Sequence, residues 1–154
     1  MFREVRRKDR EITGEELDRI LESAPYGYLS TAGADGYPYG VPISYVYDGT
    51  SVYFHCAVEG HKLDNIARSD KVSFCAVSDT EVLPDQFSTN YKSVVLFGRV
   101  RELTGEEKEG ALRRFLTKYS SEYMDAGMKY IEAAKHKTRV FKIEVEHRSG
   151  KSRR

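Results

Sequence analysis

The sequence contains no tryptophan, two cysteines and four prolines among its 154 residues. The two cysteines, Cys56 and Cys75, lie in apolar stretches and form no C-x-x-C pair. This usage is typical of buried thiols in a reducing compartment and speaks against a disulfide framework. We therefore expect a cytoplasmic protein.

Excess charge of one sign and long apolar runs are also missing. Lysine plus arginine (25) nearly balance aspartate plus glutamate (24), which leaves a formal net charge of +1. A chain close to neutral lacks the electrostatic footprint of a nucleic-acid-binding protein, although 6–10 and 151–154 are locally basic. No stretch approaches the roughly 18 apolar residues of a membrane span, and the N-terminus has no apolar signal region. We expect neither nucleic acid nor membrane as a partner, and no secretion.

Several catalytic patterns are absent too. We find no Ser-His-Asp set, no pair of catalytic carboxylates and no glycine-rich dinucleotide fingerprint. His55, Cys56 and His61 could suggest a metal site. However, successive side chains of a strand point to opposite faces, and a structural zinc site needs four ligands. We therefore expect no metal.

The sequence that is present predicts one mainly β domain spanning residues 1–154. Short runs rich in β-branched and aromatic residues are separated by Gly, Pro, Asp and Asn. They predict an antiparallel sheet of six strands or more. The expected strands are 26–33, 37–49, 50–57, 70–79, 92–104 and 138–148. Because closing a sheet removes exposed strand edges, a small, partly open barrel is the favoured architecture.

Helices are expected between some of these strands. Thr13 with Glu16, and Thr104 with Glu107, have the spacing of capping boxes at the start of amphipathic stretches. The first stretch predicts a helix over 13–24 and the second a helix that ends near residue 119. Further helices are expected over 61–69 and 121–134.

The stretch Gly60-His61-Lys62 lies where an apolar strand gives way to the helix expected at 61–69. A helix start presents unpaired N–H groups and the positive end of the helix dipole, so it favours an anion. Lysine adds a charge and histidine a donor, and together they could hold a phosphate monoester. Taken alone, the same three residues also fit a solvated helix start.

Four segments in register carry a family resemblance: VPISYVYDG, YFHCAVEGHKLDNI, STNYKSVVLFGRV and TRVFKIEVEHRSGK. Together they resemble the pyridoxamine 5′-phosphate oxidase-like flavoproteins, most closely their nitroimidazole-resistance branch, over residues 5–151. The resemblance implies a split β-barrel and a homodimer with one FMN in each of two interface clefts. It assigns cofactor-binding roles to Pro42, Ile43, Ser44, His55 and Ala57 (ring wall), His61 and Lys62 (phosphate), and Ser88, Thr89, Tyr91, Lys92 and Ser93 (approach from either subunit).

The implied function is that of an FMN-dependent oxidoreductase. The flavin would pass electrons from a donor such as NADH or NADPH to a small-molecule substrate, with nitroaromatic compounds such as 5-nitroimidazoles as one candidate class. The chain has no tryptophan and no arginine-rich phosphate motif, so vitamin B6 oxidation is not expected. The alternative is a non-catalytic flavin-binding or haem-binding protein, with His55 and His61 as candidate haem ligands. No catalytic residue is identified by the sequence.

Overall fold

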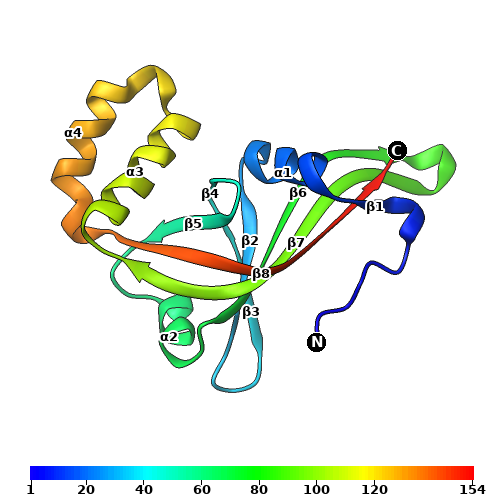
Figure 1. Ribbon diagram of the computed structural model, residues 1–154, viewed down its shortest axis with the longest axis horizontal. Helices are drawn as coiled ribbons and strands as arrows, with labels where there is room; N and C mark the ends of the chain where they lie inside the picture. The colour runs from blue at the N-terminus through cyan, green and yellow to red at the C-terminus, as the bar shows by residue number, and fades with distance from the viewer.

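The computed structural model describes residues 1–154 and confirms a mainly β, antiparallel fold with inserted helices (Figure 1). The strands are β1 (Glu11–Ile12), β2 (Gly27–Ala32), β3 (Pro38–Ile43), β4 (Val46–Tyr47), β5 (Ser51–Cys56), β6 (Lys71–Leu83), β7 (Ser88–Leu103) and β8 (Arg139–Arg153). The helices are α1 (Gly14–Ser23), α2 (His61–Arg68), α3 (Gly105–Tyr119) and α4 (Met124–Ala134). No helix combines the length and the apolar character needed to cross a membrane.

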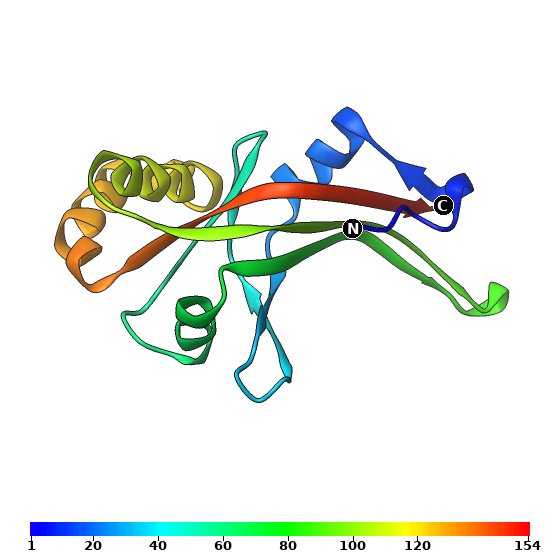
Figure 2. The ribbon, with the colours of Figure 1, turned by 60° about the horizontal axis from the view of Figure 1, so that its bottom comes forward.

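The strands form one sheet in the order β3-β2-β6-β7-β8-β5-β4, and β1 pairs with the far end of β8. The long strands β7 and β8 run through the whole molecule (Figure 2). The strands at the two ends of this order, β3 and β4, do not pair with each other, so the barrel stays open along one side. We call this opening the split. The chain crosses it between β3 and β4 through Ser44 and Tyr45.

The barrel interior holds a cluster of 18 buried hydrophobic residues. Tyr45, Phe54 and Phe74 are among its largest members and are almost completely buried. Leu17 and Leu21 of α1 complete the cluster, as the helical spacing over 13–24 predicts. Each fully buried side chain of this size contributes about 1.5–3 kcal/mol, so this cluster is the main source of the fold's stability.

A second cluster of eight buried residues lies between the α3–α4 hairpin and the sheet. Its members include Leu112 and Phe115 of α3 and Ile131 of α4. The glycine in α4 allows the two helices to approach closely, because a Cβ at Gly127 would lie 2.5 Å from Leu116 Cδ2. The hairpin therefore stands as a separate packed layer at one end of the barrel (Figure 1).

Both predicted capping boxes are wrong, although the two helices begin where they suggest. Neither Thr13 nor Thr104 makes a side-chain cap hydrogen bond. In each case the next residue is a glycine in the left-handed region, with φ of 59° at Gly14 and 58° at Gly105. A left-handed residue at this point redirects the chain, so the threonine hydroxyl does not meet the amides of the first turn.

Strand lengths also differ from expectation. The run 37–49 is broken into β3 and β4, since the chain turns at Ser44 and Tyr45 to cross the split. Conversely, β6 extends to Leu83 and β7 begins at Ser88, and together they form a hairpin arm that projects from the barrel (Figure 2). The arm's sequence is polar and contains a proline, so its residue types do not indicate a strand.

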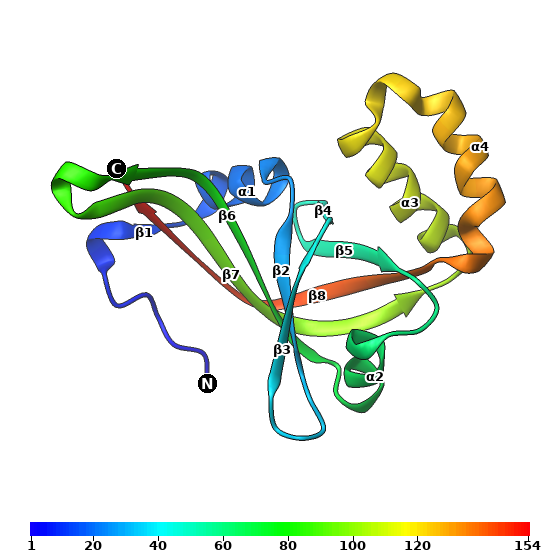
Figure 3. The same ribbon diagram turned by 180° about the vertical axis from the view of Figure 1, so that it is seen from behind.

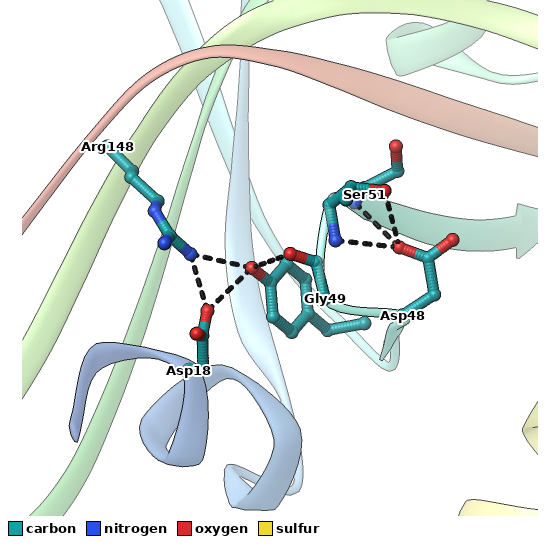
Figure 4. A network of polar contacts seen from close by, with 7 residues as sticks. Asp18, Asp48, Gly49, Ser51 and Arg148 are labelled. Carbon is teal, nitrogen blue, oxygen red and sulfur yellow. Dashed lines mark hydrogen bonds and ion pairs between the residues drawn. The ribbon is translucent and has the colours of Figure 1, made fainter. Parts of the chain in front are cut away.

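A polar network ties α1 to the sheet on the side of β4 and β8 (Figure 4). Arg148 pairs with the Asp18 carboxylate and donates to the Tyr47 hydroxyl at 2.7 Å. That hydroxyl also lies 2.8 Å from Asp18 Oδ1 and 2.8 Å from the carbonyl oxygen of Gly49. Burial and the hydrogen bond with Asp18 raise the pKa of Tyr47 to about 12. The phenol is therefore held in its protonated form.

Candidate functional site

The split is the feature around which the predicted cofactor residues can be placed. One lip is β3, and the other is β4 continued by the end of β5 that β4 leaves unpaired. The helix α2 lies at one end of the split (Figure 1). The amide of Asn65 in α2 donates to the Thr31 hydroxyl at 3.0 Å, and Arg68 donates to the carbonyl of Gly33 at 2.6 Å. Figures 1 and 3 show α2 between the β2–β3 hairpin and the end of β5. This helix therefore joins the two lips at that end.

The start of α2 has the features of an anion site. Gly60 adopts φ 154°, which favours glycine, and its carbonyl accepts from the amides of Leu63 and Asp64, both at 3.1 Å. The amides of His61 and Lys62 make no backbone hydrogen bond, and Lys62 forms no ion pair. Two free N–H groups, a free ammonium group and the positive end of a helix dipole thus converge on one turn.

His61 also connects this turn to the opposite lip. Its ring stacks on the ring of Tyr39 in β3, with centroids 3.9 Å apart and planes 28° from parallel. On the β5 side, Arg139 pairs with Glu102 at 2.7 Å and donates to the carbonyl of Val58 at 3.4 Å. The turn between β5 and α2 is therefore braced from both sides.

The structure places His55 away from His61 and Lys62. Its ring meets Phe115 of α3 edge-on, with centroids 4.6 Å apart. It lines a pocket of about 150 Å³ between β5 and the α3–α4 hairpin, whose other lining residues are Leu112, Phe115, Leu116, Tyr130, Ile131, Ala134, Lys135 and Thr138. Burial lowers the pKa of His55, which favours the neutral imidazole. The neighbouring Cys56 packs against the barrel interior instead.

The other ring-wall residues follow the alternation of β3. Ile43 packs against the barrel core, whereas Pro42 is exposed and stands opposite Tyr28 on the outer surface. Ser44 lies just past the strand and is exposed, and the amide of the next residue, Tyr45, donates to the Tyr119 hydroxyl of α3. Ala57 is exposed directly after β5. These residues therefore border the split from two sides and do not form one flat wall.

The segment from Ser88 to Ser93 lies elsewhere. It forms the first six residues of β7, where Ser88 and Thr89 lie near the tip of the arm and Lys92 pairs with Asp79 at 3.2 Å. Figures 1 and 3 both show the arm on the opposite side of the barrel from α2 and α3. One chain does not bring these residues to the split.

Tyr91 and Ser93 instead line a groove of about 640 Å³ on the outer surface of β7 and β8. Residues 1–6 run along this groove, and the ring of Phe2 stacks on Phe97 with centroids 5.2 Å apart. Ser149 and Lys151, near the end of β8, line the same groove. The start of β7 therefore pairs with the end of β8, where Ser93 is the partner of Lys151.

Sequence reasoning missed two residues that border the site, Lys118 and Tyr119 at the end of α3. The Tyr119 hydroxyl accepts from the amide of Tyr45 at 3.1 Å and lies 2.7 Å from the carbonyl oxygen of Pro25. Lys118 Nζ donates to the carbonyls of Ala24 at 2.8 Å and Tyr45 at 3.0 Å. A lysine and a tyrosine at the end of an amphipathic helix carry no sequence signal for such contacts.

Comparison with known proteins assigns the family. A family model described as pyridoxamine 5′-phosphate oxidase matches residues 13–152, and the chain belongs to this family. Comparison with curated protein sequences gives no match.

Solved structures share the fold at low sequence identity. A candidate 5-nitroimidazole antibiotic resistance protein from Bacteroides thetaiotaomicron is 22% identical, with TM-score 0.74 over 92% of this chain and 85% of that one. The flavocytochrome Anf3 from Azotobacter vinelandii is 21% identical, with TM-score 0.74 over 97% and 72%. A FAD-binding protein from Mesorhizobium loti is 22% identical, with TM-score 0.67 over 94% and 98%.

Proposed function

We propose that this protein is a homodimeric flavoprotein that binds FMN in the split and acts as an oxidoreductase. The observation that carries the proposal is the start of α2, where the free amides of His61 and Lys62 and the unpaired lysine lie on one turn beside the unpaired edge of β3. A phosphate monoester fits this donor set, because it accepts several N–H bonds and neutralises a cation.

The rest of the split suits an elongated, mostly uncharged ligand. From Tyr39, which contacts His61, to Ser44, which precedes the Tyr45 amide held by Tyr119, the chain advances five residues, or roughly 17 Å at about 3.3 Å per residue. A phosphate at α2 would leave the ring system near the α3 end, beside Ser44. Pro42, Ile43 and Ala57 border this path and carry no charge.

The chemistry would be supplied by the bound flavin, which accepts a hydride and passes electrons on. The residues of this chain would bind and orient it and limit the access of water. NADH or NADPH is the proposed donor. Nitroaromatic compounds are the proposed substrate class, supported by the structural likeness to the candidate nitroimidazole-resistance protein.

The uncharged outer surface of the sheet supports the proposed dimer. Tyr28 and Val77 are exposed there on neighbouring strands, next to Ser73 and Cys75, and none of these carries a charge. An isologous partner could cover this surface and bring its own Ser88–Ser93 segment toward the split. Light scattering at micromolar concentration should give twice the chain mass of 17.6 kDa, and a flavin-loaded monomer would contradict the proposal.

We further infer a cytoplasmic location, which the two free thiols of Cys56 and Cys75 support.

A second candidate is a non-catalytic protein that binds flavin or haem. The observation that favours haem is His55, because a neutral imidazole is a suitable axial ligand. The likeness to a flavocytochrome points the same way. His61 is less suitable, since its ring is engaged by Tyr39.

One experiment separates these functions. The absorption spectrum of the purified protein should show the two bands of an oxidised flavin, and a strong Soret band would indicate haem. Anaerobic addition of NADH or NADPH should then bleach the flavin bands. A flavin-loaded protein that neither nicotinamide reduces would support the non-catalytic alternative.

A further inference from the structure

Lys118 is a half-buried cation without a counterion. Its Nζ donates to the carbonyls of Ala24 and Tyr45 and lies 3.9 Å from the centroid of the Tyr45 ring. It forms no ion pair. Glu22 and Arg114 line the same surface depression, of about 390 Å³, but neither pairs with it. Burial accordingly lowers the pKa of Lys118 to about 8.

Holding these two carbonyls with a charged lysine costs more desolvation free energy than holding them with a neutral donor would. Two carbonyl oxygens can be satisfied by a neutral donor such as an amide, whereas a charged group loses hydration that no carboxylate here replaces. The contact with the face of the Tyr45 ring offsets part of this loss by about 0.5–2 kcal/mol. A negatively charged or electron-rich group from a bound ligand would therefore compensate the positive charge of Lys118.

The charge lies next to the proposed ring end of the split. Lys118 holds the carbonyl of Tyr45, and Tyr119 holds the amide of the same residue. Tyr45 directly follows Ser44, the exposed residue just past the end of β3. The ends of one buried residue are thus fixed by α3 at the point where the chain crosses from β3 to β4.

We propose that Lys118 supplies the positive charge of the flavin site and, with Tyr119, fixes the Ser44–Tyr45 peptide that borders the flavin ring. The inference rests on the proposed function. When a nicotinamide is the donor, one hydride, which is two electrons and a proton, leaves its ring and is added to the flavin. The nicotinamide becomes cationic and the flavin ring anionic, so a nearby uncompensated cation favours the reduced flavin. Lys118 is a positioning residue in this scheme.

The test compares Lys118→Gln with Lys118→Arg in the flavin-loaded protein. Glutamine keeps N–H donors for the two carbonyls and removes the charge, whereas arginine keeps the charge. We expect Lys118→Gln to lower the midpoint potential of the bound flavin, measured by anaerobic titration against a reference dye. Lys118→Arg should stay close to the wild-type potential.

Tyr119→Phe separates positioning from charge. Loss of the hydroxyl frees the Tyr45 amide, so the affinities for FMN and riboflavin should fall together, about threefold to tenfold for the loss of one hydrogen bond. The midpoint potential should change less than in Lys118→Gln. A loss confined to FMN would mean that this end of the split senses the phosphate, which would overturn the assignment.

The outcomes distinguish the two proposals. A wild-type protein that binds no flavin would refute the proposed function and this inference with it. A wild-type protein that binds flavin, combined with an unchanged potential in folded Lys118→Gln, would refute the inference alone. If Lys118→Gln does not fold, Lys118→Met provides the neutral variant, and a potential equal to that of Lys118→Arg would overturn the inference.

Discussion

The two ends of the split are built in opposite ways. At the α2 end, His61 is exposed, Lys62 has no partner, and the glycine before them is in open space. At the α3 end, Tyr45 is 0% exposed and its backbone amide and carbonyl are both held by side chains of α3. The first end keeps free hydrogen-bond donors for a ligand, whereas the backbone groups of the second are already bonded within the chain. In the proposed flavin site, the α2 end would supply affinity for the phosphate and the α3 end would orient the ring.

The largest effect is expected from Tyr45→Ala at the α3 end. The substitution removes a buried ring from the barrel core and a 2.6 Å hydrogen bond from its hydroxyl to the carbonyl of Leu21. We expect a loss of about 3–5 kcal/mol in the free energy of unfolding, measured by urea denaturation. The matched control is Tyr26→Ala, whose ring is 49% exposed, and it should cost less than about 1 kcal/mol. Equal losses in the two variants would contradict the comparison.

Next in size is Lys62→Ala at the α2 end. Removing one charge-assisted bond of about 1.5–3 kcal/mol should weaken FMN binding roughly tenfold to a hundredfold. Riboflavin lacks the phosphate, so its affinity should hardly change. Lys71→Ala, on an exposed strand position, is the control and should bind both ligands normally. Equal loss of FMN and riboflavin would point to misfolding or to another site, and no loss would leave Lys62 as part of a solvated helix start.

A smaller effect is expected from Tyr39→Ala, which removes the ring that stacks on His61. Such aromatic contacts contribute about 0.5–1.5 kcal/mol. FMN affinity should therefore fall about twofold to tenfold in calorimetric titrations, because His61 is no longer held at the start of α2. Tyr37→Ala changes a ring that is 76% exposed nearby and should leave the affinity unchanged. A normal affinity in Tyr39→Ala would show that the stacking does not position His61.

The smallest effect concerns alkaline pH and the network around Tyr47. Its pKa is raised to about 12 from the ordinary value of 10.0, so the protonated phenol stabilises the folded state at lower pH. This contribution is complete below about pH 10 and is lost as pH rises toward 12. In Tyr47→Phe the free energy of unfolding should fall less between pH 10 and 12 than in the wild type. Because the group is only partly buried, we expect a difference below about 1 kcal/mol. If the free energy of unfolding changed equally with pH in both proteins, the raised pKa of Tyr47 would be refuted.

The sequence predicted the barrel and most of its elements, because apolar periodicity reflects which side chains face a core. It also predicted the start of α2, since glycine, histidine and lysine there are consecutive. The contacts of Lys118 and Tyr119 with Tyr45 could not be predicted. They join residues 73 and 74 positions apart through backbone atoms, which have the same chemistry at every position.

The position of His55 shows a second limit. His55 is six positions from His61 in the sequence, and the two were assigned to one site. The strand directs His55 toward Phe115, whereas His61 follows a turn and meets Tyr39 on the other lip. Which face a strand residue occupies depends on register, and the tertiary fold decides which helix covers that face.

The arm formed by β6 and β7 has a dynamic consequence. Beyond the pair Glu81 and Asn90 it consists of two strands alone, and its tip carries Phe87, which is 96% exposed with φ 50°. Isolated two-stranded ribbons are only marginally stable in water. The amide hydrogens of the tip should therefore exchange with solvent through local opening, whereas those of the barrel should exchange only through global unfolding. A second chain lying against the arm would slow this exchange. The rate of deuterium uptake at the tip would therefore report whether two chains have assembled.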